Sequence, residues 1–459
     1  MPRRARLPRL LSRPRHRTAL AAASIGLVLS GSLAPGLVAS IDDQPPAEPR
    51  VADARDAARA PTETGEQAGK ERARKERARK APLSRADRRM AAKLRVRVRN
   101  GRLGRNVTGR VLDVRSGRTV WSDGGRKELM PASTAKVGTA VAALQALGPN
   151  RRLTTEVRTS GRTITIVGGG DALLTGRDLS RLAARTARSV KRGVSYRVRV
   201  DDTLFAAPRL SPGWSPGYYT SNVTPVRSLV VDERQVMDTA MDAGRIFAQR
   251  LRDHGLRVVS TARGEAPDGA RTVARCGTPV CEVVIEMLLV SDNDLAESLQ
   301  RLTAVETGRP ATWRGGARAQ LEVLRRLGVE TEGMRLYDGS GLSRSDRVSA
   351  AHLTSILRAA YAKGRHRRMW PLKVGLPVAG TKGTLHSSLG RFTTPQSRAA
   401  TGQVKGKTGS LHDVVTLAGV TRGADGDLLA YAFMQNGSPS TLSTKQAFDG
   451  LAATVHGSW

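Results

Sequence analysis

The chain has 459 residues, enough for two or three domains. Its hydrophobic fraction of 39% is low, but part of the shortage of apolar residues is confined to one segment. The formal net charge of +36, with a pI near 11.5, favours an anionic partner: nucleic acid, an acidic envelope polymer or a membrane surface. Aromatic residues make up only 3%, and no zinc-finger spacing or RNP-like pattern is present, which argues against nucleic acid.

Residues 1–40 have the pattern of a secretory signal. The cationic stretch "MPRRARLPRLLSRPRHR" precedes an uncharged run of apolar and small residues with a cleavage position near Ala39 or Ser40. An uncleaved membrane anchor over residues 18–40 is the alternative, because this run is about long enough to span a bilayer, although Pro35 weakens it. Either way, we expect an extracytoplasmic protein, in the cell envelope or secreted.

Residues 41–92 are predicted to be a disordered, charged linker. They consist mainly of Ala, Arg, Glu and Pro, including the repeated "KERAR", and contain hardly any large apolar side chains to bury. A short charged helix is the alternative for the repeat. Folded character begins near Leu94.

The folded part alternates between strand and helix patterns. Residues 106–124 predict two strands around a Ser-Gly turn, and residues 131–150 predict a helix that Gly148 and Pro149 end. Further strands are expected at 162–167, 195–202 and 414–436, the last as a hairpin, and further helices at 179–188, 238–255, 281–290, 311–328, 349–364 and from about 444. Strands from both ends around a helical middle predict an α+β fold with one antiparallel sheet built from both termini.

Two cysteines, Cys276 and Cys281, flank a Gly-Thr-Pro stretch. In an exported protein, a local disulfide across this turn is plausible, and we interpret the pair as a structural staple. Two cysteines without a nearby histidine make a poor metal site, and the seven histidines form no metal-ligand pattern. We predict neither a metal nor a cofactor.

The stretch Ser133-Thr134-Ala135-Lys136 opens the predicted helix at 131–150. Residues three apart share a helix face, so the Ser133 hydroxyl and the Lys136 amine point the same way. A serine hydroxyl is a weak nucleophile, and a lysine becomes its base when burial or a neighbouring cation lowers the lysine pKa. The helix N-terminus adds backbone N–H groups that suit an oxyanion. Alone the motif is weak evidence, because most such spacings are surface helix positions.

A second polar element, Ser291-Asp292-Asn293, follows an apolar helical run. Its simple interpretation is an N-cap for the next helix. Its functional interpretation is a proton relay at Ser291, with Asn293 holding Lys136 and the substrate amide.

The third element is Lys407-Thr408-Gly409, before a β-branched apolar run that suits a strand. The spacing of the preceding glycines, with Thr401 where a P-loop has its first glycine, argues against a phosphate loop. Lys407 supplies a cation for a carboxylate, Thr408 a hydroxyl, and Gly409 room for a ligand backbone beside the strand edge.

S-x-x-K, S-D-N and K-T-G in this order are the signature of penicillin-binding proteins and serine β-lactamases. In "MPASTAK", "VGGGDALLT", "VSDNDLAESL", "YDGSGLSR" and "GKTGS", the chain closely resembles the class C low-molecular-mass penicillin-binding proteins, the D-alanyl-D-alanine carboxypeptidase/endopeptidase family. The resemblance implies a serine β-lactamase/transpeptidase-like domain formed by residues 93–157 and 271–459. It is interrupted by an inserted region at 158–270, which the short interval between the first two motifs predicts to be reduced.

The resemblance also implies the roles of the site residues. Ser133 attacks the D-Ala–D-Ala carbonyl, or that of a D-Ala–meso-diaminopimelate cross-link, and Lys136 takes its proton. Lys407 and Thr408 bind the terminal carboxylate, while the backbone N–H groups of Ser133 and Ser410 form the oxyanion hole. The expected site therefore has catalytic Ser133, Lys136, Ser291 and Asn293 and substrate-binding Lys407, Thr408, Gly409 and Ser410.

Two matching stretches, Gly168–Asp171 and Tyr337–Ser343, are interpreted as turns that shape the fold. The expected partners are peptidoglycan stem peptides, β-lactams as covalent inhibitors, and anionic envelope polymers through electrostatic contact. No cofactor is implied.

Two other functions compete with a D,D-peptidase. A class A β-lactamase needs a glutamate in an E-x-x-L-N-type loop, and the chain contains no Leu-Asn pair. A non-catalytic envelope-binding protein that kept the fold is less expected, because all three motifs are intact. Penicillin labelling separates a binder from an acylating enzyme, and the deacylation rate separates a peptidase from a β-lactamase.

Overall fold

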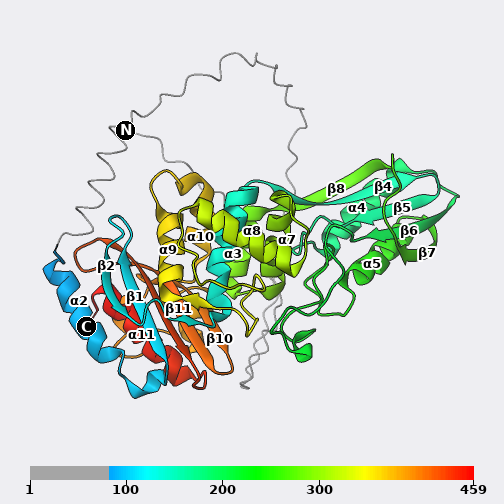
Figure 1. Ribbon diagram of the computed structural model, residues 1–459. Coiled ribbons are helices and arrows are strands. Elements are labelled where there is room, and N and C mark those ends of the chain that lie inside the picture. The colour runs from blue at the N-terminus through cyan, green and yellow to red at the C-terminus, as the bar shows by residue number, and fades with distance from the viewer. Residues whose placement is uncertain (1–81, 459) are drawn as a thin grey trace, which may run out of the picture. The chain divides into compact units, whose positions relative to one another are not determined.

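A five-stranded antiparallel sheet, in the order β10-β11-β12-β1-β2, joins the two ends of the described chain (Figure 1). In the computed structural model, which describes residues 82–458, Val107 lies opposite Gln435 and Asp113 opposite Leu429. The predicted α+β fold, with one sheet built from both termini, is confirmed. Its strands are β1 (Val107–Asp113), β2 (Thr119–Asp123), β10 (Lys405–Leu411), β11 (Val414–Arg422) and β12 (Leu428–Asn436).

Helices cover both faces of this sheet, which is why its central strand β12 is apolar along nearly its whole length. Tyr431 and Phe433 pack with α2 (Arg85–Arg97) and α11 (Leu442–His456) on one face. Their neighbours Ala432 and Met434 pack on the other face, which α9 (Ala350–Tyr361) covers. Successive strand residues point to opposite faces, so a strand buried on both sides shows no polar alternation.

Helix α2 begins inside the segment predicted to be a disordered linker, so that prediction is wrong from Arg85 to residue 92. Ser84 caps the helix by accepting a hydrogen bond from the Asp87 N–H. Met90 and Leu94, four residues apart, are buried in the apolar cluster that α2 forms with α11 and the sheet. These few apolar residues suffice because α11 and β2 supply the rest of the interface. Residues 41–81 of the predicted linker, and the predicted signal or anchor at 1–40, lie outside the described residues.

The helical middle of the chain packs on the α9 side of the sheet. The sequence missed α10, where Pro371 and a basic start hide the helical pattern. None of the helices formed by residues 82–458 combines the length and apolar character needed to cross a bilayer. The helices are α3 (Lys136–Leu147), α6 (Val280–Val290), α7 (Asn293–Glu306), α8 (Trp313–Arg326) and α10 (His366–Gly375), and the short strands β3 (Glu128–Leu129) and β9 (Val348–Ser349) pair beside them.

The inserted region forms its own five-stranded sheet, in the order β7-β6-β5-β4-β8. Its first strand β4 begins at Arg152 and pairs with its last strand β8, which ends at Pro279, so the predicted limits of 158–270 are too narrow. The reduced size relative to the family stays a prediction. The region consists of β4 (Arg152–Ser160), β5 (Thr163–Val167), α4 (Gly176–Ser189), β6 (Ser195–Asp201), α5 (Thr239–Asp253), β7 (Arg257–Arg263) and β8 (Arg271–Pro279).

The stretch Gly168–Asp171 is a turn that connects strands of the inserted sheet, in agreement with its interpretation as a turn that shapes the fold. Asp171 accepts hydrogen bonds from the N–H groups of Leu173 and Thr278, and thereby links the end of β5 to β8. A side chain at position 169 would lie 1.9 Å from the Thr154 carbonyl oxygen, so the close approach of β4 requires glycine there.

The predicted disulfide is wrong: Cys276 and Cys281 are both free thiols. The Gly-Thr-Pro stretch is not a turn but the end of strand β8, and Cys281 already lies in α6. Pairing with β4 holds β8 extended as far as Pro279, so the segment does not fold back as the predicted turn would.

Candidate active site

The fold brings the three sequence motifs together from different elements. Ser133 lies in the 3₁₀ turn η2 (Ala132–Ala135), and Lys136 follows as the first residue of α3. Ser291 ends α6 and Asn293 begins α7, with Asp292 between them as the N-cap of α7. The segment 407–410 lies in β10, the edge strand of the sheet, which contacts η2. The predicted N-cap and the predicted edge strand are therefore both confirmed.

Lys136 is the centre of the site. Its side chain is fully buried, and its Nζ donates hydrogen bonds to Ser133 Oγ at 3.0 Å, Asn293 Oδ1 at 2.7 Å and the Ser340 carbonyl oxygen at 2.8 Å. The orientation of the Asn293 amide is fixed, because its Nδ2 donates to the Asn222 carbonyl oxygen at 2.7 Å. Lys136 is thus held on Ser133 by two groups that can only accept hydrogen bonds.

This contact set also suits a neutral Lys136. A neutral amine has two N–H donors and one lone pair, and the donors are already matched by the oxygens of Asn293 and Ser340. The lone pair is then left for the Ser133 hydroxyl, which can donate its proton. Burial lowers the pKa of Lys136 to about 8, against the opposing effect of the carboxylates of Asp338 and Glu297. With this pKa about a tenth of the lysine is neutral at pH 7, and more at higher pH, which suits a general base.

Lys407 is buried as well, and it faces Ser291. Its Nζ donates to Ser291 Oγ at 2.8 Å and to the carbonyl oxygen of Thr408 at 2.8 Å. Burial first, and then the positive charge of Lys136, hold the pKa of Lys407 well below its usual value. The Thr408 hydroxyl is hydrogen-bonded to that of Thr384, at 2.8 Å. The predicted role of Lys407 in binding a carboxylate stays a prediction, and its contact with Ser291 suggests a second role.

Two non-glycine residues of the site have left-handed backbone conformations. Ala132, which precedes the predicted nucleophile, has φ +45°, and Ser291 has φ +66°. Such conformations cost free energy and are typical of places where the surrounding structure holds a residue in a required orientation. Here they direct Ser133 and Ser291 toward the two lysines.

Gly409 allows β10 to approach the turn that carries Ser133. A Cβ atom at this position would lie 3.0 Å from the Ser133 backbone nitrogen and 2.8 Å from the Pro131 carbonyl oxygen. The missing side chain therefore makes room for the protein's own backbone, in addition to the predicted space for a ligand. Ser410 is exposed one residue further along the edge strand.

The turn Tyr337–Ser343 does more than shape the fold, so the sequence interpretation was incomplete. It supplies the Ser340 carbonyl oxygen that Lys136 contacts. The buried carboxylate of Glu297 accepts hydrogen bonds from the N–H groups of Gly339 and Ser340, at 3.0 and 2.8 Å. Asp338 accepts from the N–H of Ser343 at 2.6 Å and so closes the turn. Burial, together with the charge of Asp338, raises the pKa of Glu297.

Sequence reasoning missed Glu297, although a signal was present. Glu297 follows Asn293 by four residues on α7, so both side chains lie on the same face of the helix. An acidic residue one helical turn after a site motif is a candidate for an internal contact with that site. Here that contact positions the Ser340 carbonyl oxygen against Lys136.

We expect Glu297→Gln to change the pH dependence of acylation. The carboxylate, like that of Asp338, raises the pKa of Lys136, so its removal should lower that pKa and move the rise of the acylation rate to lower pH. The measurement is acylation by a slow chromogenic β-lactam between pH 5 and 10. Glu306→Gln is the control, because Glu306 is on the same helix but has a partly exposed side chain paired with Arg151. A rate reduced equally at every pH would mean that Glu297 acts on the fold alone.

Comparison with known proteins agrees with this geometry. A family model described as the D-Ala-D-Ala carboxypeptidase 3 (S13) family matches residues 90–237 and 230–455. The chain is 33% identical over 393 residues to carboxypeptidase DacB of Mycolicibacterium smegmatis, an alignment that covers 80% of this chain and 84% of that protein. It is 27% identical over 435 residues to a D-alanyl-D-alanine carboxypeptidase of an Actinomadura species, which covers 73% and 79% of the two proteins.

A crystal structure of penicillin binding protein 4 from Haemophilus influenzae has the same fold. It superposes with a TM-score of 0.67 at 22% identity and covers 82% of this chain and 98% of that one. The same Haemophilus protein has been solved complexed with a β-lactam. Since the family model spans both halves of the main domain and the inserted region, and the mycobacterial relative aligns over most of both proteins, the chain belongs to the D-Ala-D-Ala carboxypeptidase 3 (S13) family, among the class C low-molecular-mass penicillin-binding proteins.

Proposed function

We propose that the protein hydrolyses the terminal D-Ala–D-Ala bond of peptidoglycan stem peptides through an acyl-enzyme on Ser133. The observation that carries this proposal is the fully buried Lys136, whose amine lies 3.0 Å from Ser133 Oγ and whose pKa is lowered to about 8. A desolvated lysine beside a serine at a helix start is a nucleophile and base pair for acyl transfer. The family to which the chain belongs takes its name from this reaction.

In the acylation step, Ser133 Oγ attacks the carbonyl carbon of the penultimate D-Ala while Lys136 accepts the hydroxyl proton. The negative charge that develops on the carbonyl oxygen is stabilised by the backbone N–H groups of Ser133 and Ser410. The C–N bond then breaks, and the D-Ala amine receives a proton from Ser291. Lys407 returns a proton to Ser291 and takes up the one that Lys136 accepted from Ser133, so that Lys136 is neutral again. In the second step water attacks the acyl-enzyme, Lys136 accepts a proton of this water, and Ser133 leaves with a proton returned to its oxygen.

The contact between Lys407 and Ser291 supports this direction of proton flow. An ammonium group that donates to Ser291 Oγ at 2.8 Å leaves the serine hydroxyl free to donate toward the leaving amine. Thr408 and the exposed Ser410 lie on the same edge strand, where the terminal carboxylate of the substrate binds next to the charge of Lys407.

We further propose that the protein works outside the cytoplasm and contacts anionic envelope polymers. The pattern of residues 1–40 supports export, and the net charge of +36 supports contact with polyanions. A peptidoglycan substrate is consistent with this location.

Two measurements on the purified protein test the proposed reaction. A stem pentapeptide that ends in D-Ala–D-Ala should release one D-Ala per peptide, and a fluorescent penicillin should label the protein covalently. Covalent labelling without D-Ala release would identify a β-lactam target with another substrate. Rapid loss of the label would instead identify a β-lactamase.

Lys407→Ala should separate carboxylate binding from a role through Ser291. If Lys407 binds the terminal carboxylate, the variant loses a charge-assisted hydrogen bond of about 1.5–3 kcal/mol with free-acid substrates, and much less with neutral esters. The measurement is kcat/KM for a depsipeptide acid and its methyl ester. Lys405→Ala on the same strand is the control, because its amine contacts the Lys373 carbonyl oxygen instead of the site. Equal losses for both substrates would assign Lys407 to Ser291 alone.

A further inference from the structure

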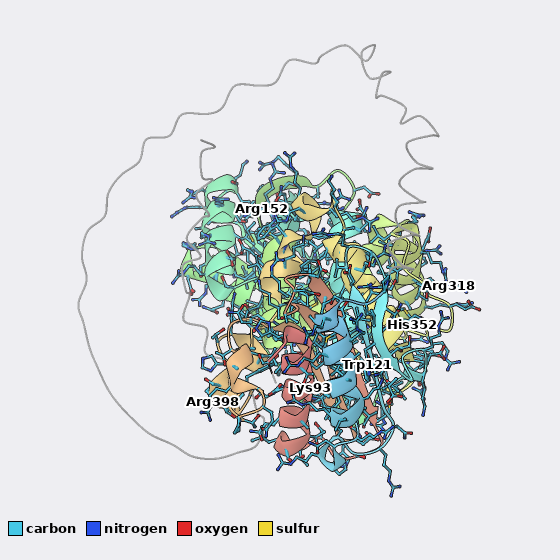
Figure 2. The ribbon with its side chains drawn as sticks, turned by 90° about the vertical axis from the view of Figure 1, so that its left-hand side faces the viewer. Lys93, Trp121, Arg152, Arg318, His352 and Arg398 are labelled. Carbon is cyan, nitrogen blue, oxygen red and sulfur yellow. The ribbon has the colours of Figure 1, made fainter. Side chains whose placement is uncertain are left out.

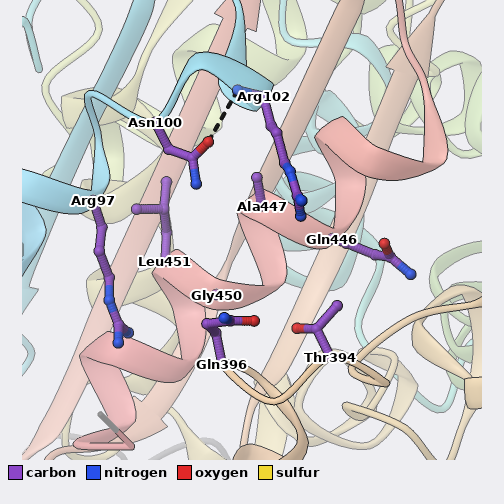
Figure 3. Close-up of a pocket in the computed structure, with 9 residues that line it drawn as sticks. All are labelled: Arg97, Asn100, Arg102, Thr394, Gln396, Gln446, Ala447, Gly450 and Leu451. Carbon is purple, nitrogen blue, oxygen red and sulfur yellow. Dashed lines mark hydrogen bonds between the residues drawn. The ribbon is translucent and has the colours of Figure 1, made fainter.

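A second concave site lies on the face of the main sheet that α2 and α11 cover. It is a hollow of about 330 Å³ whose floor is formed by Ala447, Gly450 and Leu451 of α11 (Figure 3). These helices pack with Tyr431 and Phe433, whereas the helix that begins with Lys136 packs on the opposite face of the sheet. The hollow is therefore separated from Ser133 by the sheet and is not part of the catalytic cleft.

The walls of the hollow carry hydrogen-bond donors and no carboxylate. Figure 3 shows Arg97 and Arg102 on the side of α2 and the short turn after it, with Thr394 and Gln396 facing them across α11. Asn100 and Gln446 complete the polar lining. An arginine guanidinium matches the oxygens of a phosphate or carboxylate, and amide and hydroxyl side chains suit the hydroxyl groups of a sugar or polyol.

The surface beside the hollow continues this positive charge. Figure 2 shows that face of the molecule, with Lys93 on α2 and Arg398 near the loop that lines the hollow. The only acidic residue of α2, Asp87, is buried and paired with Arg118. Arg89 is a further exposed cation of α2, whereas the exposed Arg95 and Arg99 line a separate hollow beside β2, together with Asp123.

We propose that this hollow and the α2 surface bind an anionic envelope polymer made of sugars or polyols joined by phosphodiesters. One phosphate lies at Arg102 and an adjoining hydroxylated unit lies against Gln396 and Thr394, with the next phosphate toward Arg97, whose guanidinium also donates to the Thr454 hydroxyl. The inference rests on the proposed location outside the cytoplasm. A polymer held here leaves the cleft at Ser133 free and keeps the enzyme at the wall by repeated weak contacts.

The shape of the site favours a polymer strand over a membrane surface. A flat layer of lipid headgroups does not enter a concave hollow, and Val96 is the one strongly exposed large apolar side chain of α2 that is available for insertion. Nucleic acid is disfavoured because none of the residues that line the hollow is aromatic, so bases find no stacking partner there.

The test compares charge reversals inside and outside the hollow in the full chain. Binding of a poly(glycerol phosphate) oligomer is measured at about 0.15 M salt, where charges more than about 8 Å from the ligand are largely screened. Arg102→Glu and Gln396→Glu should each weaken binding at least about tenfold, and Arg102→Glu should reduce the slope of log Kd against log salt by about one. The matched control is Arg188→Glu, an exposed position on α4 of the inserted region, which should change Kd less than about twofold.

The outcomes are distinct. Equal weakening by Arg102→Glu and Arg188→Glu would show that only net charge acts and would overturn the proposal. So would binding of the wild-type chain to phosphatidylglycerol vesicles but not to the oligomer, because the site would then be a membrane contact. Release of D-Ala from a soluble pentapeptide is measured in parallel and should be unchanged in Arg102→Glu. A chain that binds the oligomer but releases no D-Ala would contradict the proposed reaction alone.

Discussion

Ser133→Ala should abolish covalent labelling by penicillin and the release of D-Ala from a pentapeptide. The variant removes the only atom that forms the acyl bond, and no other hydroxyl contacts Lys136 among the hydrogen bonds of the described residues. Removal of this hydroxyl breaks one hydrogen bond, which contributes about 1 kcal/mol, so the protein should remain folded. Labelling is followed by fluorescence and by the mass of the intact protein, and folding by the melting temperature.

A matched control separates the nucleophile from the other serine of the site. Ser291→Ala keeps Ser133 and Lys136, so it should still be labelled, although more slowly because a proton donor is lost. An adduct on the Ser133→Ala protein, mapped by peptide mass to another residue, would show that the nucleophile is wrongly assigned.

Lys136→Arg should lower the acylation rate by about 10²- to 10⁴-fold, the usual contribution of a general base. Arginine keeps the positive charge but cannot lose its proton in a protein. In the wild-type protein, acylation should accelerate as the pH rises through about 8, since Lys136 then becomes neutral. The variant should lose this rise. The rates are measured with a slow chromogenic β-lactam between pH 6 and 10.

Lys136→Met makes this test independent of how well arginine fits the buried position. Methionine has a similar length but no charge, so a lysine that acts only by its charge would leave the arginine variant much faster than the methionine variant. A lysine that acts as a base leaves both variants equally slow. Lys405→Arg, on β10 outside the contacts of Lys136, should retain the wild-type rate and pH profile.

Much of the site was predictable because its parts are local in the sequence. Ser133 and Lys136 are three residues apart at a helix start, so the helical period alone predicts that their side chains share a face. Lys407 precedes an apolar run with a strand pattern, which predicts that it lies on a strand. The order of the three motifs then identified the family. Helices with a clear apolar period, such as α5 and α9, were predicted for the same reason.

Other features escaped prediction because they depend on packing between distant segments. Helix α2 has few apolar residues and is helical because α11 covers it, while the Cys276 segment is extended because it pairs with β4. The residues next to α2 or to Cys276 in the sequence include neither α11 nor β4, so local patterns cannot reveal these contacts. The limits of the inserted region were missed for the same reason, since β4 and β8 define them only by pairing with each other.

The sequence by itself determined which side chains are available for chemistry: a serine, two lysines and an asparagine in a recognisable order. Only the tertiary structure decided the state of those groups. Burial lowers the pKa of Lys136, as the proposed role of a base requires, and the carbonyl oxygen of Ser340, which Glu297 holds in place, helps to aim the lysine at Ser133. Every residue has a backbone carbonyl, so the residue type does not reveal which carbonyl oxygen will accept the hydrogen bond from Lys136. Burial, likewise, is a property of the whole packed chain.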